Sequence, residues 1–197
     1  RNHRPLCVLR VSNESSPFED EWVVKFTLND SLLSVIREGQ FMSAYSIEQG
    51  PIRPPSETYS LLLRVTRNCP WNRCEFCHTY KGQKFSLRTV EEVKRDIDRV
   101  KEIISEIKRI SWQHGFGGEI TAPLVNLFFQ DPQHTPDGFR QVALWLYQGA
   151  KNVFLQDGNN LILKTGDLVD ILTYLKDTFP SIERVTSYAR AKTVSKK

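Results

Sequence analysis

Three of the four cysteines lie close together in the stretch RVTRNCPWNRCEFCHTYKGQKF. Four residues separate Cys69 from Cys74, and two separate Cys74 from Cys77. Three thiolates are an odd number for disulfides and one short of a tetrahedral structural zinc site. A 4Fe–4S cluster normally has four thiolate ligands, and with three it keeps one iron open for the amine and carboxylate of a small molecule. The pattern therefore indicates a cluster with one open iron.

Basic side chains surround these cysteines in the sequence. They would offset the negative charge that thiolates and sulfides give to a cluster, which a neutral loop would not do. The four basic residues are Arg67, Arg73, Lys81 and Lys84.

Two other uses of the cysteines stay open. The first is a structural zinc-binding or nucleic-acid-binding module that uses Cys69, Cys74, Cys77 and His78. Cys77 and His78 are adjacent, which disfavours binding of one ion by both, and the chain has no second ligand pair. The second is a cysteine nucleophile with His78, His114 or His134 as its base, although no spacing marks any of these histidines.

Short apolar segments and amphipathic segments alternate after residue 58, and they must position the loop. The predicted strands are 59–66, 152–156 and 183–189. The predicted helices are 86–111, 137–150 and 167–179, while 112–135 is expected to be a loop. Strands that alternate with helices predict a parallel sheet with right-handed crossovers.

Two features mark the first predicted helix. Thr89 and Glu92 are spaced as a capping box at its start. Apolar residues then recur at steps of three and four, which predicts one buried stripe. The stripe is Val90, Val93, Ile97, Val100, Ile104 and Ile107.

Polar loops follow the first two predicted strands. The cysteine stretch follows the first, and the sequence QDGNN at 156–160 follows the second. Because the carboxyl ends of parallel strands meet at one edge, ligands bind there in such sheets. We expect both loops to face one site.

The stretch TRNCPWNRCEFCHTYK resembles the cluster loop of the radical S-adenosylmethionine (SAM) superfamily. It is most similar to a group of uncharacterised members with the pattern TRxCxxNRCxFC…YK, whose core is similar to the radical SAM domain of the Elongator catalytic subunit. The resemblance covers about residues 51–197, and it departs from the commonest spacing by one extra residue between the first two cysteines. It implies a 4Fe–4S cluster on Cys69, Cys74 and Cys77, SAM on the open iron, and reductive cleavage of SAM to a 5′-deoxyadenosyl radical.

The resemblance also implies which residues contact SAM. Phe76, the aromatic before the last cysteine, would pack near the adenine. The turn after the second strand would hold the methionyl amine, through Gln156, Asp157 and Gly158. The letters GGE also occur at 117–119, but they follow a helix, so we expect them to be incidental.

The end of the third strand completes the implied SAM site. Ser187 and Arg190 stand where the family contacts the ribose and carboxylate of SAM. An arginine suits a carboxylate because its two N–H groups can bind both oxygens.

The fold expected from the resemblance is α/β, a partial (β/α) barrel of radical SAM type that stops after its third strand. Residues 1–50 would be an N-terminal extension, and residues 51–197 would be the N-terminal part of the core. The sequence leaves open whether Met42, the only methionine, is the true start. Three strands cannot shield a radical from solvent, so we expect this chain alone not to turn over a substrate.

Composition narrows the class of protein. The 197 residues are 40% hydrophobic and 25% charged, as in a globular domain with a core, and the net charge of +4 permits RNA as a partner without requiring it. No apolar run reaches membrane-spanning length and no signal peptide is recognisable. We therefore expect a cytoplasmic enzyme without membrane contact, acting on a small molecule or RNA. The resemblance adds an electron donor such as flavodoxin or ferredoxin.

Overall fold

The structure is a computed structural model, and it describes residues 45–133 and 135–194. The predicted extension at 1–50, with Met42, lies outside the described residues except for 45–50. His134, one of the histidines considered as a base, lies outside them as well.

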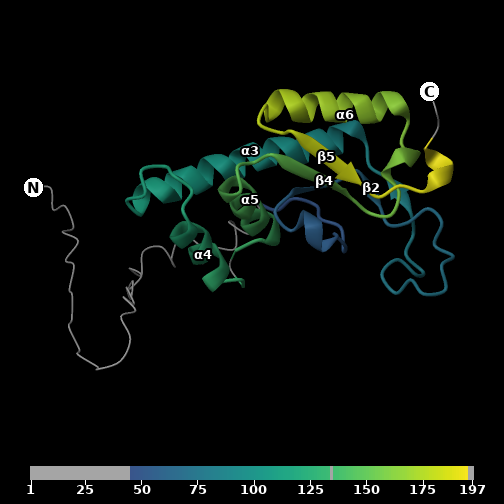
Figure 1. Ribbon diagram of the computed structural model, residues 1–197, viewed down its shortest axis with the longest axis horizontal. Coiled ribbons are helices and arrows are strands. Elements are labelled where there is room, and N and C mark those ends of the chain that lie inside the picture. Colours follow the sequence, from purple (N-terminus) through teal and green to yellow (C-terminus); the bar gives the residue numbers. More distant parts are fainter. Residues whose placement is uncertain (1–44, 134, 195–197) are drawn as a thin grey trace, which may run out of the picture.

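A parallel sheet of three strands is the centre of the fold (Figure 1). Its strands are β1 (Leu61–Arg64), β4 (Asn152–Gln156) and β5 (Arg184–Ser187). They lie side by side in chain order, with Leu61 opposite Val153 and Val153 opposite Val185. The three predicted strands and their parallel arrangement are confirmed, so the carboxyl ends of β1, β4 and β5 do meet at one edge.

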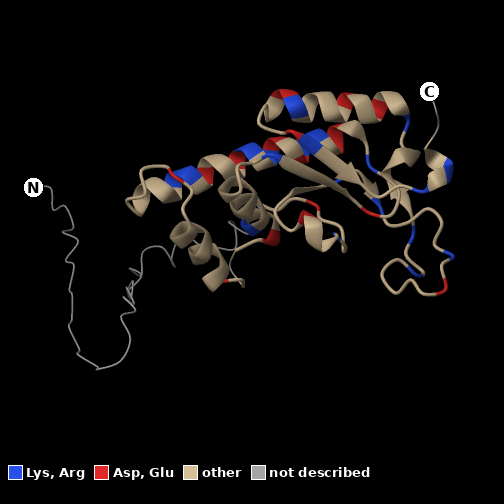
Figure 2. Cartoon of the chain, in the orientation of Figure 1, with Lys and Arg blue, Asp and Glu red and all other residues tan. Residues whose placement is uncertain are grey.

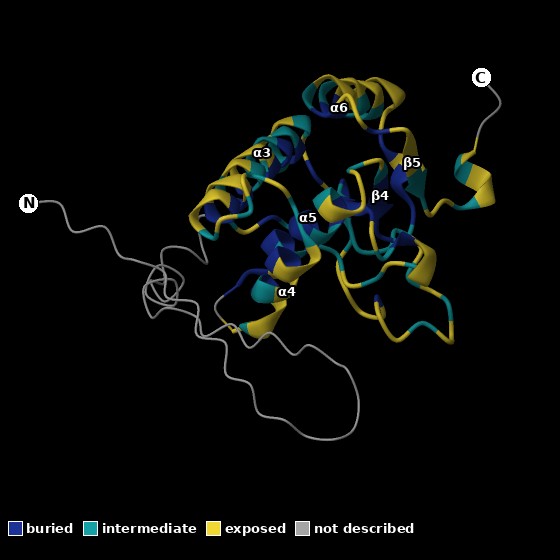
Figure 3. Ribbon diagram, turned by 60° about the vertical axis from the view of Figure 1, so that its left-hand side comes forward, coloured by how far each residue is buried: buried dark blue, intermediate teal, exposed yellow. Residues whose placement is uncertain are grey.

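Within residues 45–133 and 135–194, four α-helices accompany the sheet. They are α3 (Val90–Gln113), α4 (Ala122–Gln130), α5 (Asp137–Tyr147) and α6 (Thr165–Thr178). Helix α6 packs on α3, and α5 packs between α3, α4 and β1 (Figure 1). The outer sides of α3 and α6 are exposed, while the sides that face the sheet are buried (Figure 3). Both crossover helices therefore cover the same face of the sheet.

The predicted capping box is present at the start of α3. The Thr89 hydroxyl accepts a hydrogen bond from Glu92 N, and the Glu92 carboxylate accepts one from Thr89 N, which completes the capping box. The predicted stripe is confirmed in part. Four of its members are buried (Val93, Ile97, Val100 and Ile107), whereas Val90 and Ile104 are only partly buried and Ile103, which the stripe omitted, is fully buried.

The sequence-based boundaries of α3 need a correction. Residues 86–87 are not helical but form the short strand β3 (Ser86–Leu87), which pairs with β2 (Thr66–Arg67) in an antiparallel ribbon. The sequence could not show this pairing because two residues on each side make no recognisable alternation.

The segment 112–135 is not entirely a loop, which corrects a second expectation. It contains α4, whose start is capped by the Thr121 hydroxyl and whose second residue is Pro123. Leu124, Val125 and Phe128 bury one face of this short helix. The glycines and prolines on both sides hid a helix of about two and a half turns.

Segment 45–60 covers the sheet on the side away from α3 and α6 (Figure 1). It includes the one-turn helix η1 (Pro55–Glu57), which contacts β4. All of β4 after Asn152 is buried as a result, including Phe154. Within the described residues, no helix combines the length and the apolar character needed to cross a membrane.

Candidate metal centre

The three cysteines lie on a loop that extends from the β2–β3 ribbon at the carboxyl edge of the sheet (Figure 1). Cys69, Cys74 and Cys77 are free thiols and all are partly exposed. Cys77 N donates a hydrogen bond to Cys74 O at 3.3 Å, so the last two cysteines flank a tight turn. The loop thus presents three accessible thiols with no disulfide between them.

The arrangement of the three thiols bears on the kind of metal group that they could hold. In the part of the chain that the structure describes, no three His, Cys, Asp or Glu side chains are arranged to hold one metal ion. Zinc requires its ligands to converge on one point, whereas each thiolate of a cluster binds its own iron. His78 is exposed, so the arrangement gives no support to the four-ligand zinc site.

Basic residues are frequent around the loop (Figure 2). Arg73, Lys81 and Lys84 are exposed there, and Lys81 Nζ donates to Cys74 O at 3.4 Å. Glu75 is the one acidic residue between Cys69 and Leu87. A loop with this charge balance suits an anionic group.

The turn after β4 lies directly against the first cysteine. A Cβ atom on Gly158 would come within 3.2 Å of both Cys69 Cβ and Cys69 Sγ. The residue before it, Asp157, is fully buried, and its Oδ1 accepts a hydrogen bond from the Tyr80 hydroxyl at 2.9 Å. The predicted meeting of the cysteine loop with the QDG turn is therefore present in the fold.

Glu119, the acidic residue of the letters GGE, does not lie beside the cysteine loop. The letters GGE follow α3, and the Ser111 hydroxyl donates to Glu119 O at 2.6 Å. The cysteine loop precedes α3, and a helix of its 24 residues is about 36 Å long. The positional argument that chose QDG over GGE is thus in agreement with the structure.

Gln156 and Asp157 both use their side chains inside the protein. Gln156 Oε1 accepts from Gly50 N at 2.8 Å and Gln156 Nε2 donates to Gly50 O at 3.1 Å. The side-chain amide thus makes the pair of backbone hydrogen bonds at Gly50 that a neighbouring strand would otherwise make. Asp157 Oδ2 accepts a hydrogen bond from Arg64 Nε at 2.6 Å, and Asp157 Oδ1 accepts one from the Tyr80 hydroxyl. An ammonium group at Asp157 would have to compete with these two buried contacts.

The tail after β5 reaches the cysteine loop as well. The Arg190 guanidinium lies 4.0 Å from the centre of the Trp71 ring, and Trp71 stands between Cys69 and Cys74. Arg73 lies on the same ring at 5.4 Å. Arg190 is therefore placed at the loop, as the sequence predicts, but by stacking on an aromatic ring.

Ser187 and Phe76 are placed differently. Ser187 Oγ accepts from Asn160 Nδ2 at 2.9 Å and donates to Tyr188 O at 2.9 Å. Asn160 also accepts from the Thr66 hydroxyl at 2.8 Å, so it joins the start of β2 to the end of β5. Phe76 is 82% exposed and packs on no core residue, which leaves its ring accessible to a ligand.

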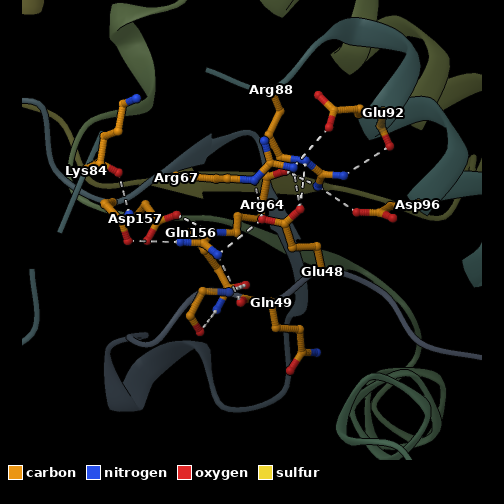
Figure 4. Close-up of polar contacts among 12 residues, drawn as sticks. Glu48, Gln49, Arg64, Arg67, Lys84, Arg88, Glu92, Asp96, Gln156 and Asp157 are labelled. Atoms are coloured by element: carbon orange, nitrogen blue, oxygen red, sulfur yellow. Dashed lines mark hydrogen bonds and ion pairs between the residues drawn. The ribbon is translucent and has the colours of Figure 1, made fainter. Parts of the chain in front are cut away.

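A network of charged residues fixes the base of the loop (Figure 4). Glu48 is its centre, because it accepts from Arg67 Nε and Nη2 at 2.7 Å each and from Arg64 Nη1 at 3.2 Å. Arg67 also binds Glu92 at the start of α3, at 3.0 Å. Arg88 lies 3.4 Å from Glu48 and 2.6 Å from Asp96. Segment 45–50, β1, β2 and α3 are thus linked by ion pairs below the cysteine loop.

Sequence reasoning missed Glu48, Arg64 and Tyr80. A signal for one of them was present, because Arg64 ends the first predicted strand and Asp157 follows the end of the second. In neighbouring parallel strands such residues are close, and Arg64 is indeed paired with Gln156 in the sheet register. Opposite charges at adjacent strand ends could have identified this pair.

Replacing Glu48 with Gln should reduce stability and its dependence on pH. The hydrogen bonds from Arg67 hold the pKa of Glu48 below its usual range. The carboxylate therefore stabilises the fold above the ordinary Glu pKa of about 4.3, and this contribution is lost as pH falls through the lower pKa of the folded state. Glu48→Gln should lose about 1 to 2 kcal/mol at neutral pH and show a flatter acid limb.

Urea unfolding at several pH values measures this effect. Glu183→Gln is the matched control, because Glu183 forms only an exposed ion pair with Lys151 at 2.8 Å. A Glu48 variant that matched this control at neutral pH would contradict the prediction.

The chain was compared with family models, with curated proteins and with solved structures, and none of the three comparisons gave a match.

Proposed function

We propose that this protein is a radical SAM enzyme whose Cys69, Cys74 and Cys77 bind a 4Fe–4S cluster with one iron left open for SAM. One observation carries the proposal. A loop with three accessible free thiols lies at the carboxyl edge of a parallel sheet, and the turn after the next strand packs on the first of these thiols. Such an edge is where α/β folds bind ligands.

The sheet topology supports the same reading. Strands β1, β4 and β5 follow one another in chain order, and α3 and α6 pack together on one face. A (β/α) barrel has this winding in each of its sectors. We therefore propose that this α/β fold is a partial (β/α) barrel, as the resemblance implies.

The chain supplies positions and charges for the bound groups. The three cysteines would hold the cluster, and exposed basic residues would offset its charge. Phe76 is available for the adenine, and Arg190 lies at the loop for the carboxylate of SAM. When bound and reduced, the cluster supplies the electron that divides SAM into methionine and a 5′-deoxyadenosyl radical.

An external protein must deliver this electron. A small electron-transfer protein such as flavodoxin or ferredoxin would meet the exposed Arg73, Lys81 and Lys84 beside the cysteines. Opposite charges on two partners raise the rate of encounter, so an acidic donor would suit this surface.

Anaerobic reconstitution of the full chain with iron and sulfide tests the cluster. We expect about four irons and four sulfides per chain. Cys69→Ala, Cys74→Ala and Cys77→Ala should each remove most of the cluster and its broad visible absorbance. Cys7→Ala is the matched control and should bind iron like the unchanged chain.

Two outcomes would overturn the assignment. One is about one zinc per chain without sulfide, together with loss of zinc in His78→Ala, which is the result expected of the zinc module. The other is full iron content in all three loop variants. SAM itself is tested by adding it to the reduced cluster, which should change the electron paramagnetic resonance spectrum and release 5′-deoxyadenosine.

A further inference from the structure

The cysteine loop is closed at its base by hydrogen bonds between its two arms. Asn68 Nδ2 donates to Lys84 O at 2.7 Å, and Asn72 Nδ2 donates to Gln83 O at 2.8 Å. Both asparagines have positive φ angles, 68° and 46°, which this residue type tolerates better than most. The loop is therefore a continuation of the β2–β3 ribbon with a defined base.

A buried tyrosine attaches the second arm of the loop to the sheet. Tyr80 follows Cys77 by three residues and is only 4% exposed. Its hydroxyl donates to Asp157 Oδ1 at 2.9 Å, and Arg64 Nε donates to Oδ2 of the same carboxylate at 2.6 Å. Burial, together with the Asp157 carboxylate, raises the pKa of Tyr80, so the hydroxyl keeps its proton and remains a donor.

The first arm of the loop meets the same turn. Asp157 has a φ of 78°, a left-handed conformation that is uncommon for a buried residue with a side chain. This turn directs the next residue, Gly158, against Cys69. Two adjacent residues of one turn thus contact both ends of segment 69–80, which carries all three cysteines.

We propose that Arg64, Tyr80 and Asp157 form a clamp that fixes the cysteine loop in its cluster-binding arrangement, with Asp157 as a positioning residue. The role of the clamp rests on the proposed function, because holding the loop in this arrangement matters for cluster binding only if the loop binds a cluster. Arg64 and Tyr80 hold the Asp157 carboxylate from two sides, and the carboxylate holds the left-handed turn. The turn then sets the position of Cys69, while Tyr80 sets the position of the arm that follows Cys77.

The contacts decide between this role and binding of the SAM amine by Asp157. The carboxylate is 0% exposed, and each of its oxygens already accepts a hydrogen bond. Because Asp157 and Tyr80 are both buried, a ligand could reach the carboxylate only if the packing around Tyr80 opened, which would release the loop. The arrangement therefore favours Asp157 as a positioning residue over Asp157 as a ligand of the SAM amine.

Amide hydrogen exchange on the full chain without metal tests the clamp. In Tyr80→Phe one hydrogen bond to a charged acceptor is lost and the ring is kept, so opening of segment 69–80 should become about tenfold more frequent. Asp157→Asn should act in the same direction, because Asn accepts the left-handed turn but cannot pair with Arg64 as an ion. Peptides from α5 should exchange as in the unchanged chain.

Tyr174→Phe is the matched control. The Tyr174 hydroxyl donates to Asp98 Oδ1 at 2.7 Å, so this variant also loses one tyrosine–aspartate hydrogen bond, but between α6 and α3. It should leave exchange in 69–80 unchanged. Faster exchange in Tyr80→Phe but not in Tyr174→Phe supports the clamp. Unchanged exchange in Tyr80→Phe, or the same increase in both variants, overturns it.

A second measurement separates this proposal from the proposed function. Reconstituted Tyr80→Phe should lose iron to a chelator about tenfold faster than the unchanged chain, since the same opening exposes the cluster. If the unchanged chain binds no iron, the proposed function fails, and hydrogen exchange still decides the clamp. If it binds iron and Tyr80→Phe loses iron no faster, the clamp is wrong although the cluster is real.

Discussion

Gly158→Val is expected to reduce iron binding by the proposed cluster site to near background while the protein remains folded. Even the first added carbon would lie 3.2 Å from Cys69 Cβ and Sγ, which is closer than carbon and sulfur atoms normally pack. Valine adds two further methyl groups beyond that carbon. Cys69 lies on an exposed loop and can move away, so the substitution should displace one ligand at a modest cost in stability.

Gly158→Ala and Gly166→Ala complete this experiment. Gly158→Ala adds only the first carbon, so it should lower iron binding less than Gly158→Val. Gly166 is the matched control, because a Cβ there meets no atom within 4 Å. Iron and sulfide per chain, with urea midpoints for each variant, measure the effect. Full iron content in Gly158→Val would show that Cys69 does not bind the cluster from this position.

Phe139→Ala should be the most destabilising single substitution among those considered. Phe139 is 0% exposed, and its ring packs edge-on against Phe128 at 5.1 Å and Tyr45 at 5.7 Å. Removing a buried phenylalanine typically costs about 3 to 5 kcal/mol, because the burial is lost and a cavity remains. Since natural domains are stable by about 5 to 15 kcal/mol, the variant should be partly unfolded on mild heating.

Phe129→Ala is the control for Phe139→Ala. Phe129 lies nearby in the same helix pair but is 47% exposed, with the Arg140 guanidinium 5.9 Å from its ring centre. Its loss should cost less than about 1 kcal/mol. Urea unfolding followed by circular dichroism measures both variants. Similar midpoints for the two would mean that the α4–α5 contact contributes little to the core.

Local patterns predicted most of the regular elements. The buried strand 152–156 and the capping box at Thr89 are both found in the structure, because each depends on residues near one another in the chain. Helix α4 was missed because nine residues carry too little periodicity, and the β2–β3 ribbon because two paired residues carry none. Boundaries of this kind depend on partners that are distant in the sequence.

The sequence by itself determined where the three cysteines and the segments beside them lie in the fold. Three cysteines after the first strand, QDG after the second and Arg190 after the third all follow from order along the chain. Because parallel strands end at one edge, that order is sufficient to bring these segments near one another. The sequence also favoured QDG over GGE for the same reason.

Only the tertiary structure decided what each side chain contacts. It paired Asp157 with Arg64 and Tyr80, Gln156 with Gly50, and Arg190 with Trp71. These partners come from strands and loops up to 119 positions apart, as in the contact of Arg190 with Trp71. Buried polar groups must find partners when water is excluded, and which partner is within reach depends on packing, which no local pattern of residues records.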